Sequence, residues 1–273
     1  MEKVRPPAVA GMFYPSDERK LKDEVRALLD AAKGEEVPSG NIKAIVVPHA
    51  GYIYSGRTAA YAYNLIRNKN YETVVVISPS HREYFPGVSV YSGEAYKTPL
   101  GLIPVNTKMR EDVTRDARLI FQGLEGHRQE HALEVQLPFL QMVLKDFNIL
   151  PIVIGDQKEQ FLNELSDRLS KVVNDKTLIV ASSDLSHFHT KKEAERLDSV
   201  VEKRISQFDY KTLLRDLNSN SCEACGGGPI VAAMRTAELL NFRNAKVLNR
   251  SDSGDVTGDN SEVVGYLSAV IYE

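Results

Sequence analysis

The 273-residue sequence contains only two cysteines, Cys222 and Cys225, which are close neighbours in the chain. Two cysteines this close in the chain cannot cross-link distant segments, so the sequence does not predict a fold stabilised by disulfides. No apolar run approaches the roughly 20 residues of a membrane-spanning helix. Residues 1–7 are charged and contain proline, with no apolar segment after them, so we expect no secretory signal. These absences favour a soluble protein in the reducing cytoplasm, with no membrane partner.

The sequence also lacks an excess of either charge. It carries 34 basic and 37 acidic residues, a formal net charge of -3, with both signs mixed along the chain. Nucleic-acid binders usually show a basic excess or stripe, because neutralising phosphates drives their affinity. We therefore expect no nucleic-acid partner, and we expect the ligand to be a small molecule or a peptide.

The overall composition, 42% hydrophobic and 26% charged, is ordinary for a globular protein. A chain of this length buries roughly three quarters of the surface that its unfolded form exposes, enough for one large core. We predict a single α/β domain over residues 1–273, with two closely packed halves as the second arrangement.

Short apolar segments alternate with amphipathic ones along most of the chain. Predicted strands cover residues 42–47, 73–77, 147–154, 177–181 and 263–272, and predicted helices cover 16–34, 56–68, 159–173 and 191–207. This alternation is typical of parallel strands joined by helical crossovers. A turn is expected at residues 38–40, and residues 88–105, around Ser92 and Gly93, predict an antiparallel addition. The fold class is thus α/β, a mixed, largely parallel central sheet with helices on both faces.

Three predicted strands are each followed closely by a histidine, namely His49, His81 and His187. In open parallel sheets, ligands bind in the crevice beyond the carboxyl ends of the strands, where such side chains converge. A single histidine at a strand end is more often a hydrogen-bonded core or surface residue than a ligand. Three of them at corresponding ends predict one shared polar pocket.

Cys225 stands just before a glycine-rich turn and an apolar helical run that begins near Pro229. The exposed N–H groups and dipole of a helix start favour a thiolate, so this position predicts a lowered pKa. Taken alone, Cys225 is better explained as a small buried hydrophobic residue. Reading Cys222 and Cys225 as a redox pair or half a zinc site is disfavoured, because no second pair follows.

Glu130, His131 and Glu134 are further polar candidates at near-helical spacing. One face of that segment would reach the pocket if the three side chains act in chemistry. The equally supported alternative is the start of a helix with an acidic first turn.

Taken in order, several segments resemble the Memo family, also called the AmmeMemoRadiSam system protein B family. The resemblance runs from about Arg5 to the C-terminus. The matching stretches are AVAGMFYP at 8–15, PHAGYIYSG at 48–56, SPSH at 78–81, EHALE at 130–134, SSDLSH at 182–187, CG at 225–226 and VGY at 264–266. Each motif is weak alone, but their order is highly specific.

This resemblance implies a fold similar to that of the class III extradiol dioxygenases, which hold non-haem Fe(II) with two histidines and a carboxylate. It assigns His49 and His81 to the two histidine ligands, puts Cys225 in place of the carboxylate, and matches His187 to the acid–base histidine. Pocket-lining residues of the family correspond to the aromatic side chains Phe13, Tyr14 and Tyr54.

A thiolate ligand is softer than a carboxylate, which shifts the preference towards zinc, copper(I) or a thiolate-tuned iron. We expect a divalent metal, with iron favoured by the resemblance and zinc and copper as the alternatives. The first hypothesis is a metal-dependent oxidoreductase or hydrolase-like enzyme with His49, His81 and Cys225 as ligands. In it, His187 is the acid or base and Asp184 is an orienting residue outside the ligand set. His131 and Glu134 are further catalytic candidates. The second hypothesis is a non-catalytic adaptor that binds a peptide or phospho-ligand in the same pocket. The third, an accessory partner of a radical-SAM system, is suggested by the family's name alone.

Overall fold

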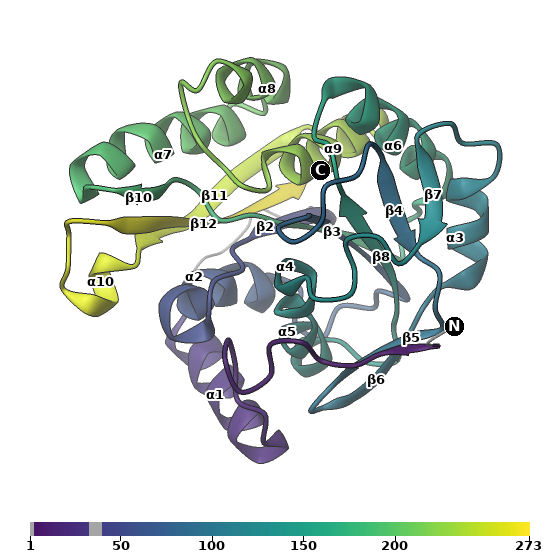
Figure 1. Ribbon diagram of the computed structural model, residues 1–273, viewed down its shortest axis with the longest axis horizontal. Helices are drawn as coiled ribbons and strands as arrows, with labels where there is room; N and C mark the ends of the chain where they lie inside the picture. The colour runs from purple at the N-terminus through teal and green to yellow at the C-terminus, as the bar shows by residue number, and fades with distance from the viewer. Residues whose placement is uncertain (1–2, 33–39) are drawn as a thin grey trace.

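The computed structural model describes residues 3–32 and 40–273 (Figure 1). The helix end expected at Gly34 and residues 38–39 of the expected turn lie outside the described residues. The largest element is a nine-stranded mixed sheet with the order β10-β12-β2-β9-β3-β8-β4-β7, in which β11 also pairs with β12. None of the described helices is both long enough and apolar enough to cross a membrane.

Parallel strands form the centre of this sheet. They are β2 (Ile42–Val47), β9 (Thr177–Ser182), β3 (Thr73–Pro79) and β8 (Asn148–Ile154), which pair in that order. Every residue of β2, β9 and β3 is buried, as expected where helices cover both faces of a parallel sheet. The prediction of a parallel core is confirmed.

Antiparallel pairing occurs on both sides of this centre. On one side β12 (Val263–Tyr272) runs antiparallel to β2, and β10 (His187–His189) and β11 (Asn244–Asp252) both run antiparallel to β12. On the other side β4 (Val88–Tyr91) is antiparallel to β8, and β7 (Ile120–Gly123) is parallel to β4. The sheet is therefore mixed, as the sequence predicts.

The antiparallel addition expected over residues 88–105 is divided between two sheets. β4 stays in the main sheet, whereas β5 (Ala95–Thr98) and β6 (Gly101–Pro104) form a hairpin in a separate three-stranded sheet with β1 (Val4–Arg5). Ser92 and Gly93 therefore connect the two sheets. The chain leaves the main sheet here because the N–H of Glu94 donates to the carbonyl of Lys3, a distant partner that local alternation does not reveal.

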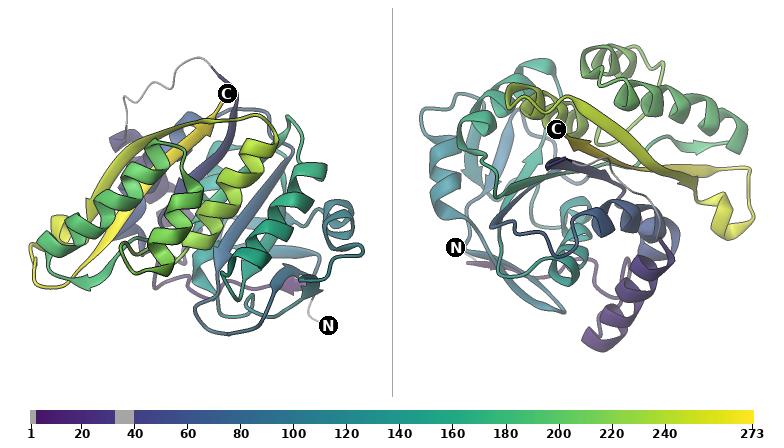
Figure 2. Two further views of the ribbon diagram at one scale, coloured as in Figure 1. Left: turned by 90° about the horizontal axis from the view of Figure 1, so that it is seen from above. Right: turned by 180° about the vertical axis from the view of Figure 1, so that it is seen from behind.

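Alternate residues of each central strand enter two separate cores, one on each face of the sheet. Ile45 and Val47 of β2 face a core shared with α1 (Glu18–Ala31), α2 (Tyr52–Leu65) and α5 (Gln136–Val143). Ala44 and Val46 face the opposite core. Figures 1 and 2 show the two layers, and the second contains α3 (Thr107–Thr114), α6 (Glu159–Val172), α7 (Lys191–Ser206), α8 (Tyr210–Asn218) and α9 (Gly227–Leu239). Helices on both faces are thus confirmed.

Helix α2 begins four residues before the position expected from the sequence. Gly51 is its N-cap, and Gly56, expected at the helix start, lies inside the helix. A Cβ atom at Gly56 would lie 2.7 Å from Cδ1 of Leu28 in α1. The glycine therefore permits close packing of α1 on α2, and it is not a signal for the helix start.

Candidate metal site

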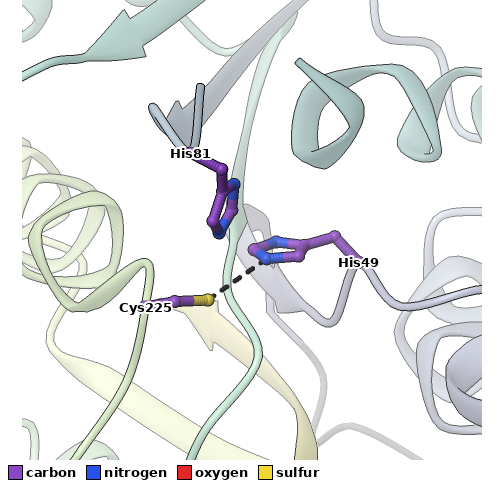
Figure 3. A group of neighbouring side chains, drawn as sticks. All are labelled: His49, His81 and Cys225. Carbon is purple, nitrogen blue, oxygen red and sulfur yellow. Dashed lines mark hydrogen bonds between the residues drawn. The ribbon is translucent and has the colours of Figure 1, made fainter. Parts of the chain in front are cut away.

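Three side chains from separate segments meet beyond the carboxyl ends of the parallel strands. His49 follows β2, His81 follows β3, and Cys225 precedes α9. One ligand atom from each lies within 4.8 Å of the other two (Figure 3). The expected convergence of His49 and His81 with a thiol is therefore present in the structure.

His49 is almost completely buried and is held at three points. Its backbone N–H donates to Oδ1 of Asp184 at 2.7 Å, and its ring Nδ1 lies 2.9 Å from Oγ of Ser182. Its Nε2 lies 3.1 Å from Sγ of Cys225. Burial, together with the neighbouring histidines His81, His131 and His187, lowers the pKa of His49 well below its ordinary value. The ring is therefore neutral and available as a ligand.

His81 is fixed by the buried carboxylate of Glu130. The backbone N–H of His81 donates to Oε2 at 2.6 Å, and Nδ1 lies 2.9 Å from Oε1. Burial alone would raise the pKa of Glu130, but hydrogen bonds from His81 and from the N–H of Ala132 outweigh it and hold that pKa below its usual value. An ionised Glu130 accepts the Nδ1 proton, so Nε2 of His81 is free to bind a metal.

His81, Glu130 and His131 form a second group of potential ligand atoms within the same spacing. This group shares His81 with the first. Oε1 of Glu130 already accepts from Nδ1 of His81 and from the N–H of Ala132. We therefore interpret Glu130 as the residue that orients His81 for the first group.

Cys225 approaches the end of β9 because glycine follows it. A Cβ atom at Gly226 would lie 2.2 Å from the carbonyl oxygen of Ser182, a contact that no other residue could make without displacement. The expected position of Cys225, just before a helix start, is confirmed. Its pKa nevertheless differs from the expectation: burial, and then the nearby Asp184, raise the pKa of the thiol, and the hydrogen bonds that favour a thiolate do not offset them.

Asp184, His187 and His131 line a cavity of about 490 Å³. Burial raises the pKa of Asp184 to about 7, whereas burial lowers the pKa of His187 and lowers that of His131 to about 4. Nδ1 of His187 lies 2.9 Å from the carbonyl of Leu185, which can only accept. His187 is therefore a neutral imidazole whose Nε2 can take up a proton. Asp184 holds the backbone of His49 and is not bonded to the ring of His187.

Phe13 and Tyr54, two of the three aromatic residues expected to bind a ligand, line the same cavity. Its charged lining residues are all acidic, Asp184 together with Asp259 and Glu262 near α10 (Gly254–Thr257), and no lysine or arginine is among the described residues of the lining. A second cavity of about 370 Å³ reaches Cys225 from the side of α8 and α9 and also includes His187.

Tyr14 and Glu134 are not among the lining residues of either cavity. Glu134 is completely buried, forms an ion pair with Arg5, and accepts hydrogen bonds from the N–H groups of Ala8 and Val9. The hydroxyl of Tyr14 donates to Oε1 of Glu134 at 2.6 Å. In α4 (His131–Glu134), one end of this short helix therefore faces the cavity and the other holds the N-terminal segment. We do not carry Glu134 and Tyr14 into the proposed site.

Sequence reasoning missed Ser182, which contacts the ring of His49, and Gln136, which contacts Ser182. Nε2 of Gln136 donates to Oγ of Ser182 at 2.8 Å and to the carbonyl of Pro48 at 2.9 Å. Both residues are fully buried. Gln136 begins a helix in which Gln141 is the only other polar residue. A glutamine in so apolar a segment is the signal that could have identified it, because a buried amide needs polar partners.

The fold and these side chains define a mixed α/β protein with a candidate metal site of two histidines and one cysteine at the ends of its central strands. The chain belongs to the Memo-like protein family, which matches residues 5–270. It is 41% identical to a MEMO1 family protein of Thermoplasma acidophilum over 268 residues, covering 97% of this chain and 98% of the relative.

One further relative agrees with this family, and one solved structure is similar in fold. A MEMO1 family protein of Methanosarcina barkeri is 37% identical, covering 98% of this chain and 100% of the relative. An uncharacterized protein, JW3007, of Escherichia coli K12 has a similar solved structure, with a TM-score of 0.56 and 14% identity, covering 84% of this chain and 99% of that one. The last likeness shows the fold alone.

Proposed function

We propose that this protein binds one divalent metal ion through His49, His81 and Cys225 and acts as a metal-dependent oxidoreductase, with iron the favoured metal and zinc or copper the alternatives. The observation that carries the proposal is the approach of three ligand atoms to within 4.8 Å of one another beside a cavity. Three protein ligands leave coordination positions open for a substrate, as in catalytic sites.

The donor set fits such a metal. In both imidazoles Nδ1 has a hydrogen-bond partner, which leaves Nε2 to bind the ion. The thiol of Cys225 lies within hydrogen-bond distance of Nε2 of His49. When bound, the metal would supply Lewis acidity and, in the case of iron, redox chemistry. We further propose a cytoplasmic setting, in which Cys222 and Cys225 both remain free thiols.

The protein's own residues would bind the substrate and move its proton. The rings of Phe13 and Tyr54 form apolar walls of the 490 Å³ cavity. His187, neutral because burial lowers its pKa, would accept a proton at Nε2 while Leu185 holds its Nδ1–H. His131 lies against Phe13, with ring centroids 4.8 Å apart, and would help to exclude water.

A non-catalytic adaptor that uses the same cavity is the second candidate function. The observation in its favour is Tyr54, an aromatic lining residue whose side chain is 41% exposed and could contact a peptide. The acidic lining disfavours a phospho-ligand, because phosphate recognition relies on arginine, lysine or helix N-termini. An accessory role beside a radical-SAM enzyme has only the family's alternative name in its support.

Metal analysis tests the proposed metal site. The protein should be purified without chelator, incubated anaerobically with Fe(II) and desalted. Its metal content should then be measured by inductively coupled plasma mass spectrometry. We expect close to one metal ion per chain in the wild type and less than about one tenth in His49→Ala and Cys225→Ala. His189→Ala is the matched control, since His189 pairs with Glu223 and should leave the metal content unchanged. Equal metal content in all four proteins would overturn the proposal.

A further inference from the structure

Three polar groups surround the buried hydroxyl of Ser182 at the end of β9. The carbonyl oxygen of Ala132 lies 2.6 Å from Oγ, Nε2 of Gln136 lies 2.8 Å away, and Nδ1 of His49 lies 2.9 Å away. A hydroxyl has one proton to donate and two lone pairs that accept. The three contacts therefore use its full hydrogen-bonding capacity, and each must be assigned a direction.

The directions follow from the partners. A carbonyl can only accept, so Ala132 takes the single proton of Ser182. Gln136 must present its NH₂ group here, because the same atom donates to the carbonyl of Pro48 while Oε1 accepts from the hydroxyl of Tyr63 at 2.8 Å. The remaining lone pair of Ser182 can only accept from His49, whose Nδ1 must therefore carry a proton.

We infer that Ser182 is a positioning residue that fixes His49 as the Nδ1–H tautomer and so presents an unprotonated Nε2 to the metal site before any metal binds. With the proton on Nδ1, the lone pair of Nε2 faces Sγ of Cys225 at 3.1 Å. The opposite tautomer would leave a lone pair of Nδ1 against a lone pair of Ser182. Its Nε2–H would also occupy the position that the metal requires.

The same short helix supports the second histidine. The carbonyl of Ala132 in α4 accepts from Ser182, and its N–H donates to Oε1 of Glu130 at 2.9 Å. Glu130 in turn accepts from Nδ1 of His81. The backbone of Ala132 thus connects Ser182, which orients His49, with Glu130, which orients His81, in one continuous set of hydrogen bonds.

The tautomer can be measured without any metal. Long-range ¹H–¹⁵N correlation spectra of metal-free protein labelled in histidine, with His49 assigned through a His49→Gln variant, report which ring nitrogen carries the proton. We expect protonated Nδ1 and unprotonated Nε2 in the wild type. An Nε2–H tautomer for His49 in the wild type would overturn the inference, and the tautomer itself is measured on the wild type.

The functional consequence rests on the proposed metal site and is tested by Co(II) titration. In Ser182→Ala we expect a mixture of tautomers and a 10- to 100-fold loss of affinity, a range typical when a partner of a ligating histidine is removed. Ser78→Ala is the matched control, because Ser78 is equally buried at the end of β3 and its hydroxyl has no partner among the described residues. It should keep the wild-type tautomer and affinity.

Each result separates this inference from the proposed function. Wild-type affinity in Ser182→Ala would overturn the positioning role even though the protein binds metal. A wild type that shows the Nδ1–H tautomer but binds no Co(II) supports the assignment of His49 and overturns the proposed function.

Discussion

Sγ of Cys225 lies 3.1 Å from Nε2 of His49, although 176 positions separate the two residues in the chain. In the Nδ1–H tautomer inferred for His49, this nitrogen can accept the thiol proton of Cys225, whose Sγ also lies 3.6 Å from the carbonyl oxygen of Asp184. A metal ion that binds both must displace that proton, since only the thiolate is a ligand. Binding of the proposed metal would therefore require the loss of this proton and of its hydrogen bond.

Metal affinity should accordingly increase with pH. Burial raises the pKa of Cys225 above its ordinary value, so the thiol is protonated at neutral pH and one proton should leave for each metal bound. We expect an increase in affinity of about tenfold per pH unit between pH 6.5 and 7.5, measured by Co(II) titration in matched buffers. Cys225→Ser, which has no thiol proton to lose at these pH values, should bind more weakly and show a flatter pH dependence. Affinity independent of pH in the wild type would contradict the displacement.

A second prediction concerns the approach of Cys225 to β9. In Gly226→Ala the new methyl group would meet the carbonyl of Ser182 at 2.2 Å, so the turn that contains Cys225 must move. We expect at least a tenfold loss of metal affinity, because a displacement of this size removes the sulfur from the metal. Gly227→Ala is the control: its methyl would meet the end of the flexible Leu217 side chain, which can shift, and not the backbone. Equal metal affinities in the two variants would contradict this reading of Gly226.

The sequence predicted the site best where residues of metal-binding type follow directly after parallel strands. His49 and His81 could be placed together because parallel strands bring their carboxyl ends to one edge, whatever their separation in sequence. Cys225 could be added through the family resemblance. The central strands could be predicted because their residues are apolar on both faces, which is typical of a buried parallel sheet.

The supporting polar contacts could not be predicted in the same way. Ser182 and Gln136 act on His49 through hydrogen bonds whose directions depend on the three-dimensional positions of Ala132, Pro48 and Tyr63. Spacing also did not separate His131, which faces the cavity, from Glu134, which faces the N-terminal segment. The side of a four-residue helix that reaches a site depends on packing partners far away in sequence.

Glu134 should contribute to stability and not to metal binding. Because its carboxylate is completely buried against Arg5, Glu134→Ala leaves an unpaired buried cation, and breaking a buried pair in this way typically costs about 3–5 kcal/mol. We expect a loss of this size in the free energy of unfolding by urea, with metal content unchanged in the folded fraction. The double variant Arg5→Met/Glu134→Leu, which removes both charges, should recover part of the loss. Loss of metal from Glu134→Ala protein that remains folded would instead show that Glu134 contributes to the metal site.

The stability of the protein should fall on acidification because of buried neutral histidines, and His127 provides the clearest case. Its Nε2 contacts the carbonyl of Ser89 at 3.2 Å, and its Nδ1 lies 2.7 Å from the hydroxyl of Tyr96. Burial lowers the pKa of His127 from 6.5 to about 3 in the folded state. Between these two values the unfolded chain binds a proton that the folded protein does not. The stabilising contribution is therefore complete above pH 6.5 and is lost as the pH falls towards 3, by about 1.4 kcal/mol per pH unit.

Urea unfolding at pH 7, 6 and 5 measures this slope directly. His127→Gln should be less stable at pH 7, by about 1–3 kcal/mol because its hydrogen bonds are lost, but its stability should decline less steeply with acidification than that of the wild type. Tyr96→Phe is the control, since it removes one hydrogen bond to His127 and keeps the titrating ring, so its slope should match the wild type. If His127→Gln and the wild type lose stability equally between pH 6 and 5, another group is responsible for the acid sensitivity, because a proton taken up by the unfolded state at His127 cannot be taken up by a glutamine.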